Sequence, residues 1–300
     1  MTTATSSDRF AALPGPVRGA IWMIFGGLSL VTMAIIIRHL APRFSVLEMI
    51  FLRSVVSLAL ILPWAIRQGA ARLATQRLWL HVLRNVIHYI GNIGWFIGVT
   101  LVPLADLSAL QFTVPLFTVV LAAVVLHETV GRHRWIATAV GFLGMLVIVR
   151  PGFATINNGT IALLLSALFY ASSQTATKML SRTEPANRVV FYMALVFVPV
   201  SGIPAAFDWV TPDWPDAVPI VLLGVTGYTA HFCIVRSFAA ADASFVIPFD
   251  FLRLTLSALF GFILYLERPD MWTLMGAAVI FGATWYNAVH ETRRVPGIPA

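Results

Sequence analysis

Long apolar runs separated by short polar breaks fill almost the whole chain. Each run is close to the roughly 20 residues that a membrane-spanning helix needs. The pattern predicts an all-α integral membrane protein with ten spans and short connections. The predicted spans are residues 19–37, 45–66, 79–101, 104–126, 134–150, 159–179, 187–206, 217–239, 243–265 and 271–289.

The second half of the chain repeats the first at a nearly constant offset. Arg38 pairs with Lys178 at an offset of 140, and Glu128 pairs with Glu267 at an offset of 139. Five spans per copy is an odd number, so the second copy must be inserted upside down relative to the first. Inverted repeats occur in many secondary transporters, with the substrate site where the halves meet. We therefore expect a tail at residues 1–18, repeats at 19–152 and 158–290, and a second tail at 291–300.

Composition supports a lipid environment. Hydrophobic residues make up 59% of the chain and charged residues 11%, with a mean hydropathy of +0.85. Soluble domains average roughly 45–50% apolar and about 25% charged residues. The charges are too few to cover a water-facing surface, which excludes a large soluble enzyme, a disordered chain and a nucleic-acid binder. A lipid bilayer is the expected partner, and no nucleic acid is expected.

The formal net charge of +7 indicates orientation. Twelve Lys or Arg residues fall on one side of the predicted spans and four on the other. Because Lys and Arg concentrate in cytoplasmic loops, both termini are predicted to be cytoplasmic. The outer-side residues are Arg38, Arg43, Arg150 and Arg268, whereas Arg53, Arg84, Arg236 and Arg253 fall within spans.

Motifs of other functional classes are missing from the sequence. The one cysteine, Cys233, supplies neither an internal disulfide nor a metal cluster. His127-Glu128 begins an HExxH motif, but Gly131 stands where the second His is required. An intramembrane enzyme and a channel with a filter signature are the rival classes that this disfavours. We expect no catalytic residue, no metal site and no cofactor.

Span three carries the strongest polar stripe. His81, Asn85, His88, Asn92 and Trp95 follow one another at steps of four and three residues, which places them on one helix face. Polar residues in a span usually face protein or a water-filled cavity. We expect this stripe to line a cavity. The alternative is that such polar groups bond across helices as structural glue.

Asp250 and Arg253 are the sharpest charged pair. They lie one helical turn apart and can form an internal ion pair. Asp250 could accept from the ammonium of a zwitterion and Arg253 could donate to its carboxylate. The alternative is a structural pair that closes one side of the cavity. Arg53 is expected to neutralise a neighbour or reach toward an interface.

Aromatic and histidine side chains complete the candidate site. Aromatic walls suit an apolar substrate group, although packing alone also explains any single ring. His88 and His231 could carry a proton or be neutral core residues. The hinge candidates are Pro115 and Pro248, because proline kinks helices. The candidate substrate-binding residues are His88, Tyr89, Asn92, Trp95, Gln111, Tyr170, Tyr228, His231, Asp250 and Arg253.

Short motifs add a resemblance to a known family. Phe51-Leu52-Arg53 resembles an aromatic-x-Arg element in the EamA branch of the drug/metabolite transporter superfamily. Gln111–Leu116, with Glu128 13 residues after its proline, resembles that family's fourth span and the glutamate that closes it. Glu267 resembles the same ending in the second half. Leu254 departs from the pattern, because it stands where the repeat would place a proline.

This resemblance implies a transporter that works by alternating access without ATP. Within the family, the aromatic-rich interior is most similar to YddG-type amino-acid exporters. That implies export of aromatic and other apolar amino acids across a bacterial inner membrane, from a site between spans one, three and four and spans six, eight and nine. A nucleoside, a cofactor, a drug or an organic cation on the same fold is the alternative. Proton coupling, and a monomer or a weak homodimer, are left open.

Overall fold

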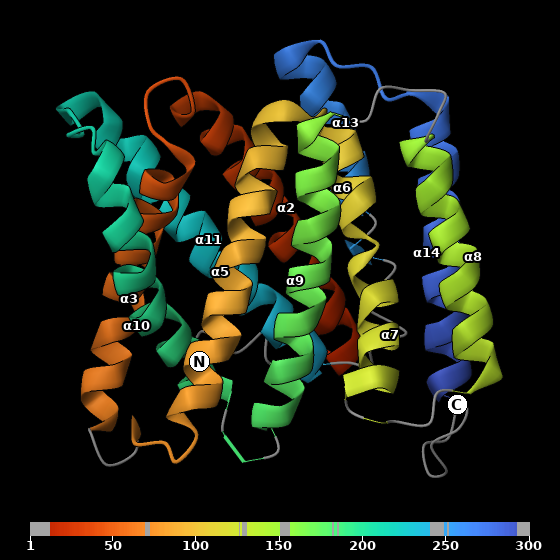
Figure 1. Cartoon of the computed structure of the whole chain (residues 1–300), viewed down its shortest axis with the longest axis horizontal. Coiled ribbons are helices and arrows are strands. Elements are labelled where there is room, and N and C mark those ends of the chain that lie inside the picture. Colours follow the sequence, from red (N-terminus) through yellow and green to blue (C-terminus); the bar gives the residue numbers. More distant parts are fainter. Residues whose placement is uncertain are drawn as a thin grey trace, which may run out of the picture.

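Every regular element of the described chain is a helix, and the described residues contain no strand (Figure 1). The structure is a computed structural model that describes residues 13–69, 73–125, 127, 131–150, 157–181, 183–184, 186–240, 249–250 and 252–292. Two short 3-10 turns, η1 and η2, lie at residues 206–208 and 214–216. The α-helices are α2 (Gly15–Leu40), α3 (Val46–Gln68), α5 (Leu78–Leu101), α6 (Leu104–Gln111), α7 (Val114–Val125), α8 (Arg132–Val149), α9 (Asn158–Ser181), α10 (Ala186–Ala205), α11 (Ala217–Ala240), α13 (Leu252–Tyr265) and α14 (Met271–Thr292).

The fourth predicted span is interrupted rather than continuous. Its helix divides into α6 and α7 at residues 112–113, two residues before Pro115. Proline has no N–H to donate to the carbonyl four residues earlier, here that of Gln111. The break therefore falls at the first hinge candidate, and its role as a hinge stays a prediction. Pro248, the other hinge candidate, lies outside the described residues.

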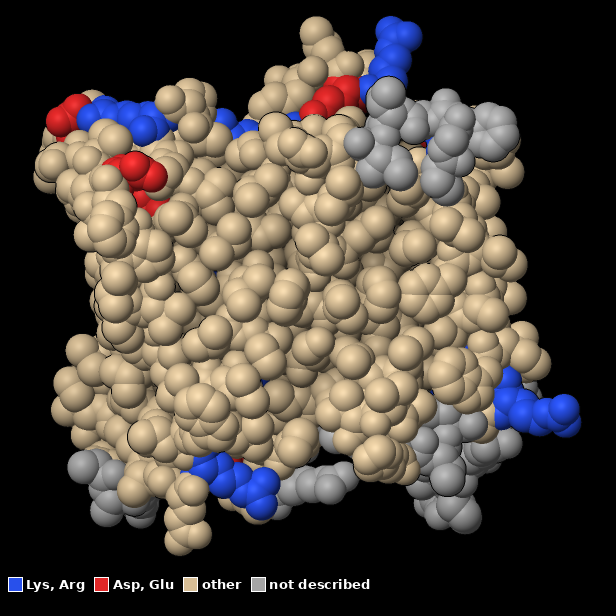
Figure 2. All heavy atoms as spheres, viewed as in Figure 1, with Lys and Arg blue, Asp and Glu red and all other residues tan. Residues whose placement is uncertain are grey.

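An apolar belt separates two charged ends. On the face shown in Figure 2, Lys, Arg, Asp and Glu lie near the two ends of the helices, with a broad tan zone between them. Among the described residues, six stretches are long and apolar enough to cross a membrane. They cover most or all of α2, α3, α6 with α7, α8, α10 and α11, and shorter apolar helical stretches lie at Leu252–Tyr265 and Met271–Tyr286.

Helices α5 and α9 fall outside that set for a physical reason. The polar stripe of α5 and the Ser, Thr and Gln residues of α9 lower the mean hydropathy of both helices. The two helices pack against each other along much of their length, and α5 also contacts α2, α3 and α10. Because the polar stripe lies on the buried face of α5, its side chains need not face lipid.

The two halves of the bundle are inverted relative to each other. At one end, Arg38 of α2 bonds to Val99 near the end of α5 and to Glu267 just after α13, so these three helices finish there. Arg150, just after α8, bonds to Asp270, just before α14. Helices α5 and α9 accordingly run in opposite directions (Figure 1). Contacts follow the same symmetry, because α5 packs on α9 while α11 packs on α2.

The repeat is also visible in the backbone. His127 and Leu266 both adopt positive φ, at 51° and 57°, and each precedes a glutamate that the sequence repeat pairs. Leu266 N–H donates to the Phe262 carbonyl at 3.0 Å, which closes α13 with a left-handed cap. Non-glycine residues rarely adopt this conformation, so its recurrence at equivalent positions reflects a shared local structure.

Glycines allow α5 and α9 to approach closely. A Cβ atom added at Gly94 would lie 2.6 Å from the Ala162 carbonyl oxygen. One added at Gly98 would lie 2.3 Å from Leu163 side-chain atoms. The GxxxG motif at these positions is therefore part of the α5–α9 interface, as such motifs are in many membrane helices.

Candidate functional site

A cavity of about 290 Å³ opens between α3, α10 and α11. It extends from Arg53, in the first half of α3, to Trp64 and Arg236 near the ends of α3 and α11. Those ends lie opposite the Arg38–Glu267 contact and on the side predicted to be cytoplasmic. The cavity is lined by Arg53, Ser54, Ser57, Ile61, Trp64, Val190, Met193, Ala194, Phe197, Gly227, Tyr228, His231, Phe232, Val235 and Arg236.

Glycines of α11 bring α3 close enough to form one wall of this cavity. A Cβ atom at Gly224 would lie 2.3 Å from Val56 Cβ, and one at Gly227 would lie 3.0 Å from Arg53 Cδ. The stem of Arg53 therefore occupies the space that Gly227 leaves. Arg53 thus lies at this close approach and is one of the residues that line the cavity.

Rings from four helices meet beside the cavity. His88 of α5 lies 4.8 Å from Tyr170 of α9, 5.6 Å from Phe197 of α10 and 5.8 Å from His231 of α11, measured between ring centroids. Among these, Phe197 and His231 also line the cavity. The structure thus brings together three sequence-predicted candidates, His88, Tyr170 and His231. Tyr228, a fourth, lines the cavity and stacks on Phe232 at 6.0 Å.

The polar stripe of α5 is buried on one face, with all five members at most 8% exposed. None of the five is among the lining residues of this cavity. His81 stacks on Tyr192 at 4.5 Å, and Asn85 Nδ2 donates to the Tyr192 carbonyl at 3.1 Å. His88 Nε2 and Asn92 Nδ2 have no partner in the described chain. The stripe therefore backs the aromatic cluster, and the expected lining role stays a prediction.

The predicted ion pair of Asp250 and Arg253 forms, with Nη2 and Oδ2 3.3 Å apart. Arg253 also lies over the Phe112 ring at 5.0 Å and against Gly27 of α2. Neither member of the pair lines the cavity between α3, α10 and α11. A direct role in holding substrate there would need a different conformation.

Three further candidates are buried in the packing between helices. Tyr89 lies edge-on to Phe197 at 6.0 Å, and Trp95 lies 5.7 Å from Phe96. Gln111 Nε2 donates to the Leu163 carbonyl at 3.5 Å, which joins α6 to α9. No group of three or more His, Cys, Asp or Glu in the described chain could hold a metal ion.

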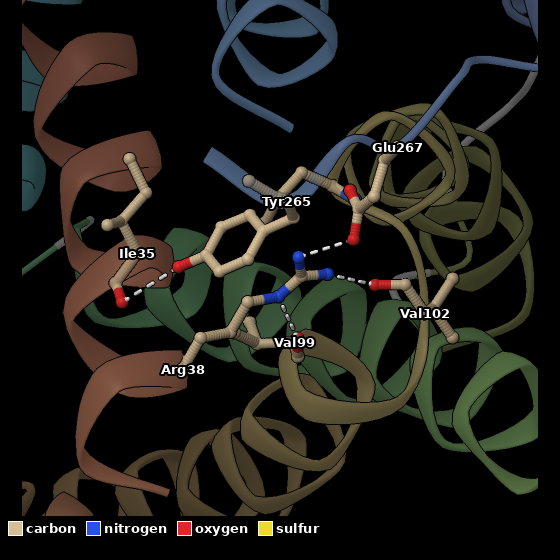
Figure 3. A network of polar contacts seen from close by, with 7 residues as sticks. Ile35, Arg38, Val99, Val102, Tyr265 and Glu267 are labelled. Carbon is tan, nitrogen blue, oxygen red and sulfur yellow. Dashed lines mark hydrogen bonds and ion pairs between the residues drawn. The ribbon is translucent and has the colours of Figure 1, made fainter. Parts of the chain in front are cut away.

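A polar network closes the end of the bundle opposite the cavity (Figure 3). Arg38 donates to Glu267 and to the carbonyls of Val99 and Val102, each at 2.5 to 2.7 Å. The second oxygen of Glu267 accepts from Leu104 N–H at 2.8 Å. These bonds join α2, the α5–α6 connection and the end of α13, so helices of both halves are held together.

Three of the four outer-side arginines, Arg38, Arg43 and Arg150, are paired with carboxylates. Besides Arg38, Arg43 bonds to Asp213 and lies 2.9 Å from Asp216, and Arg150 bonds to Asp270. Hydrogen bonding to Asp213 is the largest effect that raises the pKa of Arg43. The carboxylates neutralise these arginines, which explains how they sit at an end predicted to be non-cytoplasmic.

The other end has a carboxylate clamp of its own. Glu184, between α9 and α10, accepts from Thr75 at 2.5 Å and from Arg188 at 2.6 Å. Burial alone would raise the pKa of Glu184, but the bonds from Thr75 and Arg188 outweigh it and hold that pKa below its ordinary value. These bonds join the connection between α9 and α10 to the segment just before α5. None of Thr75, Glu184 and Arg188 lines the α3–α10–α11 cavity.

The family follows from a comparison of the whole sequence. A model described as the EamA-like transporter family matches residues 17–150 and again residues 157–288. The chain belongs to the EamA-like transporter family. The two matches show two EamA repeats, as the resemblance implied. The resemblance to YddG-type exporters is not specifically supported.

Named relatives of this EamA-like transporter carry different cargoes. It is 32% identical to the S-adenosylmethionine uptake transporter of Rickettsia prowazekii, over 94% of this chain and 96% of the relative. It is 30% identical to a riboflavin transporter of Rhizobium johnstonii, over 93% of each chain. It is 25% identical to the pseudopaline exporter CntI of Pseudomonas aeruginosa, over 87% and 93%. All three names are those of small-metabolite transporters, not enzymes.

A solved structure supports the fold alone. A crystal structure matches the EamA-like chain with a TM-score of 0.62 at 16% identity, covering 93% of this chain and 98% of the other. At this identity, the likeness extends to the arrangement of helices and carries no argument about cargo.

Sequence reasoning gave Arg53 a structural role, whereas the structure places it in the cavity wall. The expected neutralising neighbour is absent from its described contacts, which are the Met33 sulfur at 3.9 Å and the rings of Phe96 and Phe197. A signal was present, because Arg53 lies in the middle of an apolar span with no acidic residue one turn away. Such a charge inside a membrane protein marks a functional site by default.

Proposed function

We propose that the protein is a secondary transporter that moves a small metabolite bearing a planar ring by alternating access. One observation carries the proposal. The cavity of about 290 Å³ has walls that include Phe197, Tyr228 and Phe232, and it extends toward one end while the opposite end is closed by the Arg38–Glu267 network. Ring-shaped groups gain from such walls through burial and stacking.

In its narrower form, the proposal is export of aromatic amino acids across a bacterial inner membrane. Support comes from the charge bias, which predicts that the end of the cavity at Trp64 and Arg236 is cytoplasmic, where an exported substrate enters. All ten predicted spans would then cross the bilayer, including α5 and α9.

A second candidate is uptake of a larger ring-containing cofactor. The relatives named for S-adenosylmethionine and riboflavin favour it, because both of those compounds contain a planar heterocycle. The names of the relatives include an uptake transporter and an exporter, so direction is proposed from the charge bias and not from kinship.

Counterflow in proteoliposomes tests the proposal. Vesicles loaded with unlabelled tryptophan should accumulate labelled tryptophan, and parallel vesicles should be loaded with riboflavin or S-adenosylmethionine. Tyr228→Ala should slow exchange by roughly tenfold, because truncating a buried aromatic contact costs on the order of 1–3 kcal/mol. Phe262→Ala, which removes an exposed ring of α13, is the matched control. Exchange of riboflavin or S-adenosylmethionine alone would select the second candidate, and exchange of none would contradict both.

Orientation is tested separately by cysteine labelling. In a Cys233→Ser background, a cysteine at exposed Trp214 should react with an impermeant maleimide added to intact cells. A cysteine at exposed Arg67, in the last turn of α3 and at the opposite end of the bundle, should react only after the cells are opened. The reverse pattern would place the Trp64–Arg236 end of the cavity outside.

A further inference from the structure

The cavity wall holds a buried guanidinium without an acidic partner. Arg53 is 4% exposed, and no ion pair of the described chain includes it. Its nearest described contacts are the Met33 sulfur at 3.9 Å and the faces of Phe96 and Phe197 at 5.6 and 6.0 Å. A cation buried among such groups is strongly unfavourable unless an anion joins it.

Two other arginines within the spans, both half-buried, have the partners that Arg53 lacks. Arg84 donates to Thr177 at 3.0 Å and to Asn85 at 2.7 Å, and Arg253 is paired with Asp250. Packing alone therefore leaves the guanidinium of Arg53 unexplained. Its position in the cavity wall makes it available to a ligand.

The remaining lining sets the charge that the cavity accepts. It contains a second arginine, Arg236, which is exposed near the end of α11, and it contains no Asp or Glu. The field in the cavity is therefore positive, which attracts anions and repels cations. The aromatic rings of the walls also favour a ligand that carries an apolar group.

We propose that Arg53 binds the carboxylate of a small aromatic acid, so that the preferred cargo is a ring-bearing monocarboxylate. This rests on the proposed function and names its substrate class. The planar guanidinium offers two parallel N–H donors to a carboxylate. One buried cation balances one negative charge, whereas a phosphate monoester carries nearly two at pH 7. Gly227 supports the assignment, because a side chain there would displace the Arg53 stem.

Three compounds with the same indole ring separate the possibilities. Indole-3-propionate has the carboxylate alone, tryptophan has carboxylate and ammonium, and tryptamine has the ammonium alone. Binding is measured as thermal stabilisation of the purified protein in detergent, and transport as competition in tryptophan counterflow. We expect indole-3-propionate to bind and compete at least as well as tryptophan, and tryptamine to do neither.

Arg53 variants then test the residue itself. Arg53→Gln should weaken indole-3-propionate binding by about tenfold to a hundredfold, the effect of losing a hydrogen-bonded charge. Arg67→Gln, which changes an exposed arginine on the same helix, should leave it unchanged. The empty Arg53→Gln protein should melt no lower than the original, because the change removes an unpaired buried charge. If Arg53→Gln fails to fold, Arg53→Lys is measured instead. Lysine keeps the positive charge but lacks the two parallel N–H donors of the guanidinium.

The outcomes distinguish this inference from the proposed function. Acid binding that depends on Arg53, without exchange of any ring compound, supports the inference and contradicts the transport proposal. Tryptophan exchange that is unchanged in Arg53→Gln supports transport and overturns the inference. Tryptamine binding as tight as that of the acid overturns the inference as well.

Discussion

Replacing Glu267 with glutamine is expected to open the end of the bundle that the Arg38 network closes. The carboxylate accepts from Arg38 at 2.5 Å and from Leu104 N–H at 2.8 Å, so one substitution weakens both contacts. The side chains of Arg38 and Glu267 are 11% and 22% exposed, which leaves Arg38 without a countercharge in a mostly dry site. Charge-assisted hydrogen bonds contribute about 1.5–3 kcal/mol each, so the open state should gain roughly tenfold to a hundredfold in population.

A buried reporter beneath the network measures this change. Val99 is 0% exposed, and its carbonyl accepts from Arg38. In a Cys233→Ser background, a Val99→Cys variant should react slowly with an impermeant maleimide. Adding Glu267→Gln should raise that rate by about tenfold or more, in step with the population of the open state.

Asp213→Asn is the matched control for the closed end. Asp213 is also an acidic partner of an arginine at this end, but its side chain is 66% exposed, and Arg43 keeps Asp216 as a second partner. Exposed pairs contribute about 0–1 kcal/mol, so labelling of Val99→Cys should hardly change. Equal labelling rates in the Glu267 and Asp213 variants would show that the network does not hold this end closed.

Gly94→Ala is expected to destabilise the protein through the α5–α9 interface. The new methyl group would lie 2.6 Å from the Ala162 carbonyl oxygen, a backbone atom within α9 that cannot rotate away. Overpacking of this kind typically costs about 1–3 kcal/mol. The melting temperature in detergent should fall, and counterflow should fall with it, because α5 holds His88 against Tyr170.

The same chemical change elsewhere provides the control. A Cβ atom at Gly282 of α14 meets nothing within 4 Å, so Gly282→Ala adds a methyl group without a clash. Alanine also favours a helix more than glycine does. The melting temperature of Gly282→Ala should match or exceed that of the original chain. If Gly94→Ala melts at the same temperature as Gly282→Ala, then α5 and α9 accommodate the added methyl group without loss of stability, and the prediction is contradicted.

Local patterns predicted the helices because helix formation depends on neighbouring residues. The spans predicted at 45–66 and 79–101 correspond to α3 and α5 within two residues at each end. Pro115 marked the break between α6 and α7, and the spacing of Asp250 and Arg253 anticipated their ion pair. The pairing of Glu128 with Glu267 located the position that later proved to bond Arg38.

The location of the cavity could not be predicted in the same way. The site was predicted between spans one, three and four and spans six, eight and nine. Of the helices around the cavity, α11 corresponds to span eight, whereas α3 and α10 correspond to spans two and seven. Which faces meet depends on contacts between distant residues, such as Gly224 against Val56. A single helix's periodicity indicates its buried face, but not the helix it faces. The same holds for Arg53, whose lack of an acidic partner appears only once the neighbouring helices are in place.

The contact of Arg38 with Glu267 also bears on how the chain is made. The two residues are 229 positions apart, and synthesis proceeds at roughly 5–20 residues per second. Arg38 is therefore translated on the order of 10–50 seconds before its countercharge exists. Throughout that interval Arg38 lies at the end of α2 without this carboxylate. The carboxylate arrives only with the segment after α13, so a ribosome that stalls before it leaves a chain in which this end of the bundle lacks the Arg38–Glu267 contact.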